Sequence, residues 1–362
     1  MSVYVAATRQ NDGKTVASLG LINALAKRAK NIGYMKPVGQ QYLLIDGEKI
    51  DKDVVLMQKI FGYTTPLPFM SPIAIPSGFT EQYILNGDRS VLVDKVRSSY
   101  DKLREAYDYI LVEGTGHAGV GSVFDMSNSQ VASVLGLKVI IVTCGGIGRP
   151  IDEILLNYAT FSNRGVEVLG VIVNKVLKKK YEKVNDLVRR GFLRKGIDVL
   201  GVVPFERILS NPLMSELLAQ LDGELLCGEK GLTNSIERFV IGDMVAHEAF
   251  AYLKGSTILI TSGYREAFIF AALGGAMFGA TGQYNIAGII ITYGRKPPQK
   301  VIDVIARLNI PLVVVEEDSF TIAHAIANMI FKLRAEDKTK IKKTELLIEK
   351  YVDVDKIYNM TK

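Results

Sequence analysis

The stretch ATRQNDGKT at residues 7–15 joins a short apolar run to the start of a helical pattern. In such a strand-to-helix turn, the main-chain N–H groups point toward one place and carry partial positive charge, which stabilises an anion. Lys14 adds a full positive charge that can reach outer phosphates, and the Thr15 hydroxyl is placed to ligate Mg²⁺. The usual spacing has glycine where Thr8 stands, so an ordinary turn with a chance Gly-Lys-Thr is the alternative.

Short apolar runs alternate with amphipathic segments from the first residue to about Val203. This alternation predicts an α/β fold, in which parallel strands form a sheet and crossover helices flank it. We predict strands at residues 3–7, 33–38, 109–113, 139–143, 168–173 and 200–203, and helices at 15–30, 90–106, 151–164 and 180–195.

The segment 205–212 interrupts this rhythm, and Pro212 is a suitable start for a helix. We therefore predict domains at residues 1–205 and 206–333, followed by a charged helical tail at 334–362 with weak packing. The second domain is smaller and also α/β. Its predicted helices are 213–221, 246–253, 266–278, 298–308 and 319–333, and its predicted strands are 238–241, 257–261, 287–292 and 312–315.

The composition is that of a soluble α/β protein, with 48% hydrophobic and 23% charged residues in a chain long enough for two cores. No stretch reaches the length of a membrane span, and the N-terminus lacks an export pattern, so we expect a cytoplasmic protein with no membrane partner. The net charge of +6 lies largely at residues 178–180 and 338–343 without interleaved aromatics, so no nucleic-acid partner is expected. Cys144 and Cys227 lack the spacing of a disulfide framework or a metal site.

Charged residues at the predicted strand ends are candidates for metal and substrate binding. Glu113 ends an apolar run and precedes a Gly-rich turn, and Asp53 stands just before an amphipathic helix. Carboxylates are hard oxygen ligands for Mg²⁺, so Thr15, Asp53 and Glu113 form the predicted metal site. A strand-end carboxylate facing water and a helix cap are the alternatives. Lys36 ends the second strand, where its ammonium could bind a substrate carboxylate or a phosphate. An ordinary surface lysine is the alternative.

Other polar residues give weaker signals. His117 lies beside Glu113, but the three histidines share no metal spacing. In the second domain, Arg265 and Arg295 each follow a Gly-rich turn after a strand and could bind a second anionic ligand. Ordinary turn residues at a subunit contact fit the same pattern.

Several motifs in residues 1–205 resemble the dethiobiotin synthetase family of P-loop proteins. They are the loop at 7–15, Lys36-Pro37-Val38, Asp53 before a helix, and Val-Glu-Gly-Thr-Gly at 112–116. The resemblance implies binding of ATP with Mg²⁺, roles for Lys14 and Lys36 in catalysis, and an adenine contact by Asn174. The nucleotide contacts that it implies are Thr8, Asn11, Asp12, Gly13, Lys14, Thr15, Val16 and Asn174, and the metal ligands are Thr15, Asp53 and Glu113.

The same resemblance has two departures that concern the reaction. Arg9 replaces an aspartate of the family's loop, and the segment 39–42 replaces its small, hydroxyl-bearing substrate segment. Dethiobiotin formation is therefore not expected.

Residues 206–330 resemble the DRTGG domain through the segments 237–251, 261–266 and 288–294. Tyr264 stands where that domain has aspartate, and Tyr293 where it has glycine. A DRTGG domain follows a dethiobiotin synthetase-like domain in the N-terminal part of long bacterial phosphotransacetylases. Only a short charged tail follows here, so we expect no phosphotransacetylase activity.

Two functions stay open at this point. In the first, the chain is a regulatory or sensory module that binds MgATP, and its second domain dimerises or transmits binding to a partner protein. In the second, it is an ATP-dependent ligase or ATPase that phosphorylates a small carboxylic acid held by Lys36. The binding residues are recognisable and the substrate residues are not, which favours the first. We expect a homo-oligomer in either case.

Overall fold

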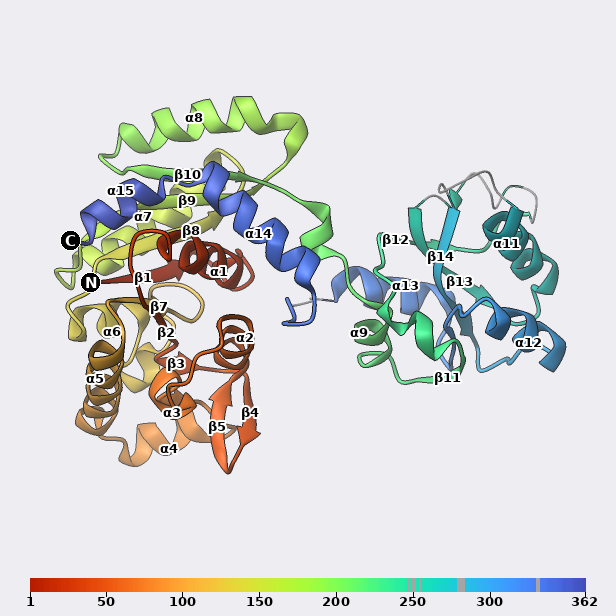
Figure 1. Ribbon diagram of the computed structural model, residues 1–362, viewed down its shortest axis with the longest axis horizontal. Coiled ribbons are helices and arrows are strands. Elements are labelled where there is room, and N and C mark those ends of the chain that lie inside the picture. The colour runs from red at the N-terminus through yellow and green to blue at the C-terminus, as the bar shows by residue number, and fades with distance from the viewer. Residues whose placement is uncertain (246–247, 249–251, 254, 279–283, 330–332) are drawn as a thin grey trace. The chain divides into compact units, whose positions relative to one another are not determined.

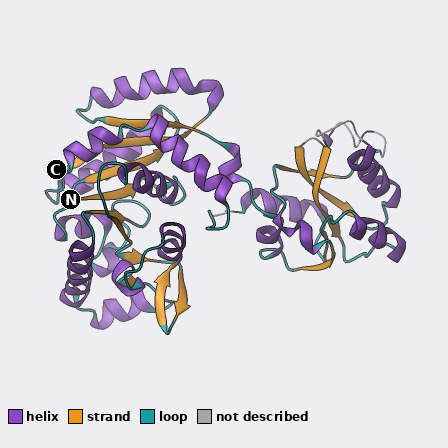
Figure 2. Cartoon of the chain, viewed as in Figure 1, coloured by secondary structure: helices purple, strands orange, loops and turns teal. Residues whose placement is uncertain are grey.

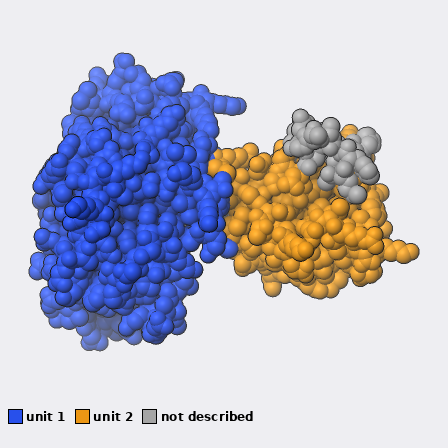
Figure 3. Space-filling view, viewed as in Figure 1, with its two compact units in different colours: residues 1–206, 333–362 blue, residues 207–332 orange. Residues whose placement is uncertain are grey.

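The computed structural model describes residues 1–245, 248, 252–253, 255–278, 284–329 and 333–362. The chain divides into two compact units (Figure 3). The first comprises Met1–Glu206 together with Leu333–Lys362, and the second comprises Arg207–Lys332. The charged tail thus belongs to the first unit, whereas we had expected a separate segment.

A six-stranded parallel sheet forms the centre of the first unit, as far as the chain is described (Figure 2). Its order is β10-β9-β8-β1-β7-β2, which places β1 in the interior of the sheet. These strands are mostly apolar and buried, as expected for a parallel sheet with helices on both faces, and this confirms the predicted fold class. The strands are β1 Ser2–Ala7, β2 Ile32–Met35, β7 Tyr109–Glu113, β8 Val139–Cys144, β9 Val168–Val176 and β10 Val199–Pro204.

Helices connect these strands. The predicted crossover helices are present, although the first is shorter than expected and ends at Leu25. Among the described residues, no helix is long and apolar enough to cross a membrane. The flanking helices are α1 Lys14–Leu25, α5 Arg89–Ala106, α6 Asn128–Val134, α7 Gly148–Ser162 and α8 Tyr181–Leu193.

Of the insertion between β2 and α5, only a helix near Asp53 was predicted. The strand expected at 33–38 ends at Met35, and after Pro37 the chain forms short pairs and a hairpin. The hairpin turns at Asp46 and Gly47, both with positive φ, as in the turns that match strand twist. The elements are β3 Val38–Gly39, β4 Tyr42–Ile45, β5 Glu48–Asp51, α2 Lys52–Phe61, α3 Leu67–Met70, β6 Ile73–Ala74 and α4 Phe79–Asn86.

The second unit contains a five-stranded mixed sheet within its described residues, in the order β11-β15-β14-β13-β12. Strands β12 to β15 are parallel, and β11, which was not predicted, runs antiparallel to β15. The helix predicted at 246–253 lies mostly outside the described residues. The elements are α9 Met214–Leu218, β11 Gly223–Cys227, β12 Arg238–Ile241, β13 Gly255–Ser262, α11 Glu266–Phe278, β14 Tyr284–Thr292, α12 Gln299–Arg307, β15 Leu312–Val315 and α13 Ser319–Asn328.

The C-terminal helices α14 Lys338–Tyr351 and α15 Val354–Met360 pack on the first unit, in contrast to the weak packing that we expected. Figure 1 draws α14 beside α1. The two helices approach closely at Gly20, where an added Cβ would collide with the side chain of Ile348. The buried positions of α14 follow helical spacing, although its sequence is rich in lysine. These positions are Lys340, Thr344, Leu347 and Ile348.

Replacing Ile348 with alanine should lower the free energy of unfolding by about 2–4 kcal/mol, because the side chain is 2% exposed and packs on α1. Leu346→Ala is the matched control on the same helix. That side chain is 52% exposed, so its loss should cost less than about 0.5 kcal/mol. Urea unfolding measures both, and equal small effects would mean that α14 does not pack here.

Candidate functional site

The loop at residues 8–13 joins β1 to α1 at the carboxyl edge of the first sheet. Asn11 and Gly13 have φ of 68° and 99°, so the chain turns sharply there. Gly13 is the N-cap of α1 and receives no side-chain cap bond from the described residues. The first turn of α1 also carries no acidic side chain. Its N–H groups therefore remain available to an anion.

Side chains from β9 and α1 hold the carbonyl side of the loop. Asn174 Nδ2 donates to Asp12 O at 3.0 Å, and Lys175 Nζ donates to Asn11 O at 2.6 Å. Lys14 Nζ donates to Arg9 O at 3.3 Å. These bonds engage three carbonyls of the loop and restrict the orientation of its backbone.

Asn174 therefore lies at the loop. Its Nδ2 is used by Asp12 O, and its Oδ1 accepts from the main-chain N–H of Lys175 at 2.9 Å. A Cβ on Gly13 would collide with this amide, so the asparagine also requires glycine at the N-cap. The adenine contact that we predicted for Asn174 stays a prediction, and the contacts of the structure assign the amide to loop support.

Asp12 and Thr8, both predicted to contact nucleotide, bond to each other in the buried wall of the loop. Thr8 Oγ1 donates to Asp12 Oδ2 at 2.6 Å, and Cys144 Sγ donates to Asp12 Oδ1 at 3.1 Å. Burial and the Asp12 carboxylate raise the pKa of the Cys144 thiol to about 12. That thiol is accordingly protonated at neutral pH and is a structural donor.

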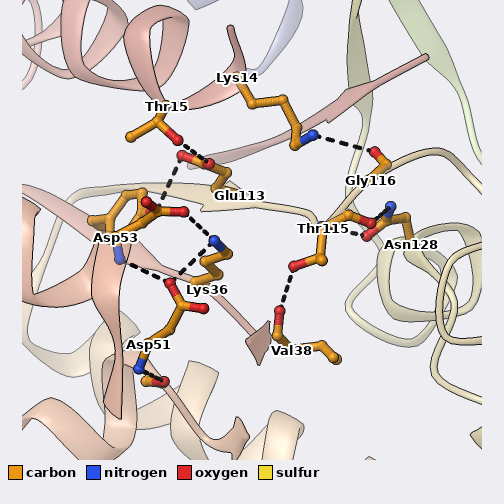
Figure 4. A network of polar contacts seen from close by, with 12 residues as sticks. Lys14, Thr15, Lys36, Val38, Asp51, Asp53, Glu113, Thr115, Gly116 and Asn128 are labelled. Carbon is orange, nitrogen blue, oxygen red and sulfur yellow. Dashed lines mark hydrogen bonds and ion pairs between the residues drawn. The ribbon is translucent and has the colours of Figure 1, made fainter. Parts of the chain in front are cut away.

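Lys14 is the first residue of α1. Its ammonium is buried and lies 3.4 Å from Gly116 O in the turn after β7 (Figure 4). Burial lowers the pKa of Lys14, and the Glu113 carboxylate opposes that effect. Its two partners are neutral carbonyl oxygens at long distance, which a phosphate oxygen would replace favourably.

Glu113 receives two hydroxyl groups at the end of β7. Thr15 Oγ1 donates to its Oε1 and Tyr34 OH to its Oε2, both at 3.0 Å. The side chain is 1% exposed, and burial raises the pKa of Glu113, which Lys36 opposes and Asp53 reinforces. Tyr34 could not be singled out from the sequence, because its partner lies on a strand that is distant in the chain.

Lys36 lies between two carboxylates, as Figure 4 shows. Its Nζ pairs with Asp53 and lies 3.1 Å from Asp51 Oδ1, and all three side chains are buried. Burial lowers the pKa of Lys36, but the two carboxylates outweigh it and raise the pKa above its usual value. Asp51 caps α2 by accepting from Asp53 N at 2.8 Å, so the helix cap is Asp51 and not Asp53.

The predicted Mg²⁺ ligands are only partly assembled. The Thr15 hydroxyl and the Glu113 carboxylate are adjacent hard oxygen donors beside the loop, which suits Mg²⁺. Asp53 is already paired with Lys36. Within the described part of the chain, no three His, Cys, Asp or Glu side chains gather as a metal site. A Mg²⁺ ion here would thus need phosphate and water oxygens as its remaining ligands.

Asn128 fixes the turn that follows Glu113. It accepts from Thr115 N at 3.0 Å and from Tyr4 OH at 2.8 Å, and it donates to Thr115 O at 2.8 Å. Thr115 Oγ1 in turn donates to Val38 O at 2.5 Å (Figure 4). Gly116, the partner of Lys14, follows directly, so this network sets the position of that carbonyl.

Three further residues were named as candidates from the sequence. His117 Nδ1 accepts from Gly119 N at 3.2 Å within its own turn. Arg265 donates to Gly242 O and Met244 O at 2.5 and 2.7 Å, which leaves its guanidinium committed to the chain after β12. Arg295 lies over the ring of Tyr264, 5.6 Å from its centre. The two arginines follow neighbouring strands, β13 and β14, and the second anion site stays a prediction.

A surface cavity of about 510 Å³ lies away from the loop, between β10, the end of α8 and the start of α15. Salt bridges and main-chain bonds occupy its charged residues, such as Lys356 with Asp198 and Arg189 with Val199 O. None of the phosphate-loop residues lines it. The shape of the cavity therefore gives no guide to the chemistry at β1.

A parallel sheet with this loop after an interior strand defines a P-loop nucleotide-binding domain. The chain belongs to the AAA_26 family, described as an AAA domain, whose family model matches residues 1–213. A DRTGG domain matches residues 216–329. These matches confirm both resemblances drawn from the sequence.

Curated relatives agree with this pairing of domains. The phosphate acetyltransferase of Nitratidesulfovibrio vulgaris is 23% identical over 97% of this chain and 50% of its own length. That of Synechocystis is 23% identical over 100% and 52%. The ATP-dependent dethiobiotin synthetase of Methanocaldococcus jannaschii is 27% identical over 57% of this chain and 99% of its own length. The chain spans about half the length of these acetyltransferases.

Solved structures show weaker likeness. The MinC:MinD complex of Aquifex aeolicus matches 57% of this chain and 83% of its own with 17% identity and a TM-score of 0.38. The CBS and DRTGG domains of Clostridium perfringens pyrophosphatase match 36% and 57% with 17% identity and a TM-score of 0.25. At these scores the likeness carries no argument about function.

Replacing Glu113 with glutamine should flatten the pH dependence of stability. Burial raises the pKa of Glu113 in the folded chain, so the folded state keeps this proton to higher pH than the unfolded state. The contribution of Glu113 to the free energy of unfolding of the ligand-free chain should therefore fall as pH rises from about 4 upward through the raised pKa. Urea unfolding at a series of pH values should show a smaller fall in Glu113→Gln.

Glu81→Gln is the control, because Glu81 is an exposed residue of α4. Its slope should equal that of the wild type. An unchanged slope in Glu113→Gln would contradict the raised pKa.

Proposed function

We propose that this chain binds MgATP at the loop between β1 and α1 and acts as a regulatory or sensory nucleotide-binding module. The observation that carries the proposal is the convergence of three groups at one sheet edge. These are the open N-terminus of α1, the Lys14 ammonium, and the Thr15 hydroxyl beside Glu113. A polyphosphate with a hard divalent cation complements that set.

Each group has a defined task on binding. The N–H groups of the first turn of α1 hold phosphate oxygens, and Lys14 exchanges its two carbonyl partners for phosphate oxygens. Thr15 and Glu113 would hold Mg²⁺, which neutralises phosphate charge when bound. The added cation also stabilises the ionised Glu113, because at present this buried carboxylate lies near that of Asp53 as well as near Lys36 and Lys14.

Lys36 favours a regulatory role over ligation. A ligase of the kind considered above needs this ammonium for its carboxylic acid substrate. Here the ammonium is buried and paired with Asp51 and Asp53, so binding an acid would leave two buried carboxylates without their cation. Breaking a buried pair in this way costs about 3–5 kcal/mol.

The path of the chain supports a link between the second unit and the loop. The chain enters the second unit after β10 and returns from it into α14. That helix packs on α1, the helix that begins at the phosphate loop. Lys343 of α14 also lies 3.4 Å from Glu206, where the chain leaves the first unit. The proposal includes a role for the second unit, which dimerises or transmits nucleotide binding to a partner. It also includes a cytoplasmic location.

The alternative is an ATP-dependent ligase that acts on a small carboxylic acid. The match to a dethiobiotin synthetase over 99% of that enzyme's length favours it. It requires Lys36 to leave its two carboxylates when the acid binds. The two functions differ in one measurable respect, which is phosphate release stimulated by an added acid.

Calorimetric titration with MgATP should give saturable binding to the wild type and about 10- to 100-fold weaker binding to Lys14→Ala, since one charge-assisted contact to phosphate is lost. Lys30→Ala is the matched control, because Lys30 is an exposed lysine just beyond α1. It should bind like the wild type.

Phosphate release is measured on the same samples with a panel of small carboxylic acids. The regulatory proposal expects no stimulation by any of them. Acid-dependent release that Lys36→Met abolishes would favour the ligase, and the absence of MgATP binding by the wild type would refute both functions.

A further inference from the structure

A β-bulge interrupts the pairing of β9 with β10 beside the phosphate loop. Val173 pairs with Val202 and Val176 pairs with Pro204, so β9 has one more residue than β10 across this interval. The extra length falls at Asn174 and Lys175. Bulges re-aim side chains and occur next to functional sites more often than elsewhere.

Lys175 adopts a left-handed backbone conformation inside this bulge, with φ of 58°. A residue with a long side chain is rare in that region of φ, and holding it there costs free energy that the surroundings must offset. The chain just after β8 packs closely against the bulge, because a Cβ on Gly145 would lie 2.8 Å from Val176 Cα and 3.0 Å from Lys175 O.

The bulge directs two successive side chains of β9 at the phosphate loop. Asn174 donates to Asp12 O, and the Lys175 ammonium donates to Asn11 O at 2.6 Å. In regular strand geometry, successive side chains point to opposite faces of the sheet, so both could not reach the same loop. The left-handed residue makes this double contact possible.

We propose that Lys175 is a further positioning residue of the nucleotide site. Its ammonium holds the carbonyl of Asn11 outward, which keeps the loop in the shape that presents N–H groups to the phosphates. The bulge and the left-handed backbone serve to bring that ammonium to the loop. This inference rests on the proposed binding of MgATP.

The test compares MgATP dissociation constants and ligand-free melting temperatures of full-length variants. Lys175→Met should weaken binding about tenfold, because a charge-assisted hydrogen bond that shapes the loop is lost. Lys175→Arg keeps the charge and a donor, and should restore most of the affinity. Lys175→Asn relieves the backbone, since asparagine tolerates left-handed φ, yet it cannot reach Asn11 O.

Lys175→Asn therefore separates positioning from stability. It should melt no lower than the wild type and still bind MgATP about as weakly as Lys175→Met. Lys179→Met is the matched control, because it removes the same charge from an exposed position four residues on. Its affinity should equal that of the wild type.

The outcomes distinguish this inference from the function on which it rests. If the wild type binds MgATP, and Lys175→Met and Lys175→Asn both bind it as tightly as the wild type does, the inference is overturned while the proposed function stands. An affinity loss of the same size in Lys179→Met would also overturn it, because net charge would then be the cause. If the wild type does not bind, both fall together.

Discussion

The backbone orientation of one turn, residues 8–13, is the constraint on which the site depends. A peptide group has a donor on one side and an acceptor on the other, so a turn that offers N–H groups to an anion must satisfy its carbonyls elsewhere. Asn174 and Lys175 do this for the carbonyls of Asp12 and Asn11. This support is possible because β1 lies inside the sheet. Strands β8 and β9 lie on one side of β1, and the side chains of Asn174 and Lys175 come from that side.

Buried charge is the second feature that organises the site. Lys14 and Lys36 face Asp51, Asp53 and Glu113 where little water reaches them, and each ionised group depends on the others. Two of these residues were chosen from the sequence as free ligands for substrate or metal, namely Lys36 and Asp53. In the folded chain they bind each other. This mutual pairing is what makes regulation a better account of the site than ligation.

Much of the first unit could be predicted, because buried parallel strands appear in a sequence as continuous apolar runs. The loop at residues 8–13 directly follows the first of these runs. Of the insertion after Met35, only the helix near Asp53 could be predicted, since strands of two to four residues carry no clear period. The packing of α14 was not predicted, because its sequence is rich in lysine and its buried positions become apparent only where it packs on α1. Tyr34, Asn128 and Lys175 were missed because their roles arise from pairing between distant strands and from a bulge, neither of which a single sequence displays.

The most direct test of this account is a crystal structure with Mg²⁺ and a non-hydrolysable ATP analogue. The account predicts the outer phosphates at the N-terminus of α1, with Lys14 Nζ on a phosphate oxygen and no longer on Gly116 O. Nucleotide bound at another place, or a loop whose N–H groups turn away from the phosphates, would contradict it.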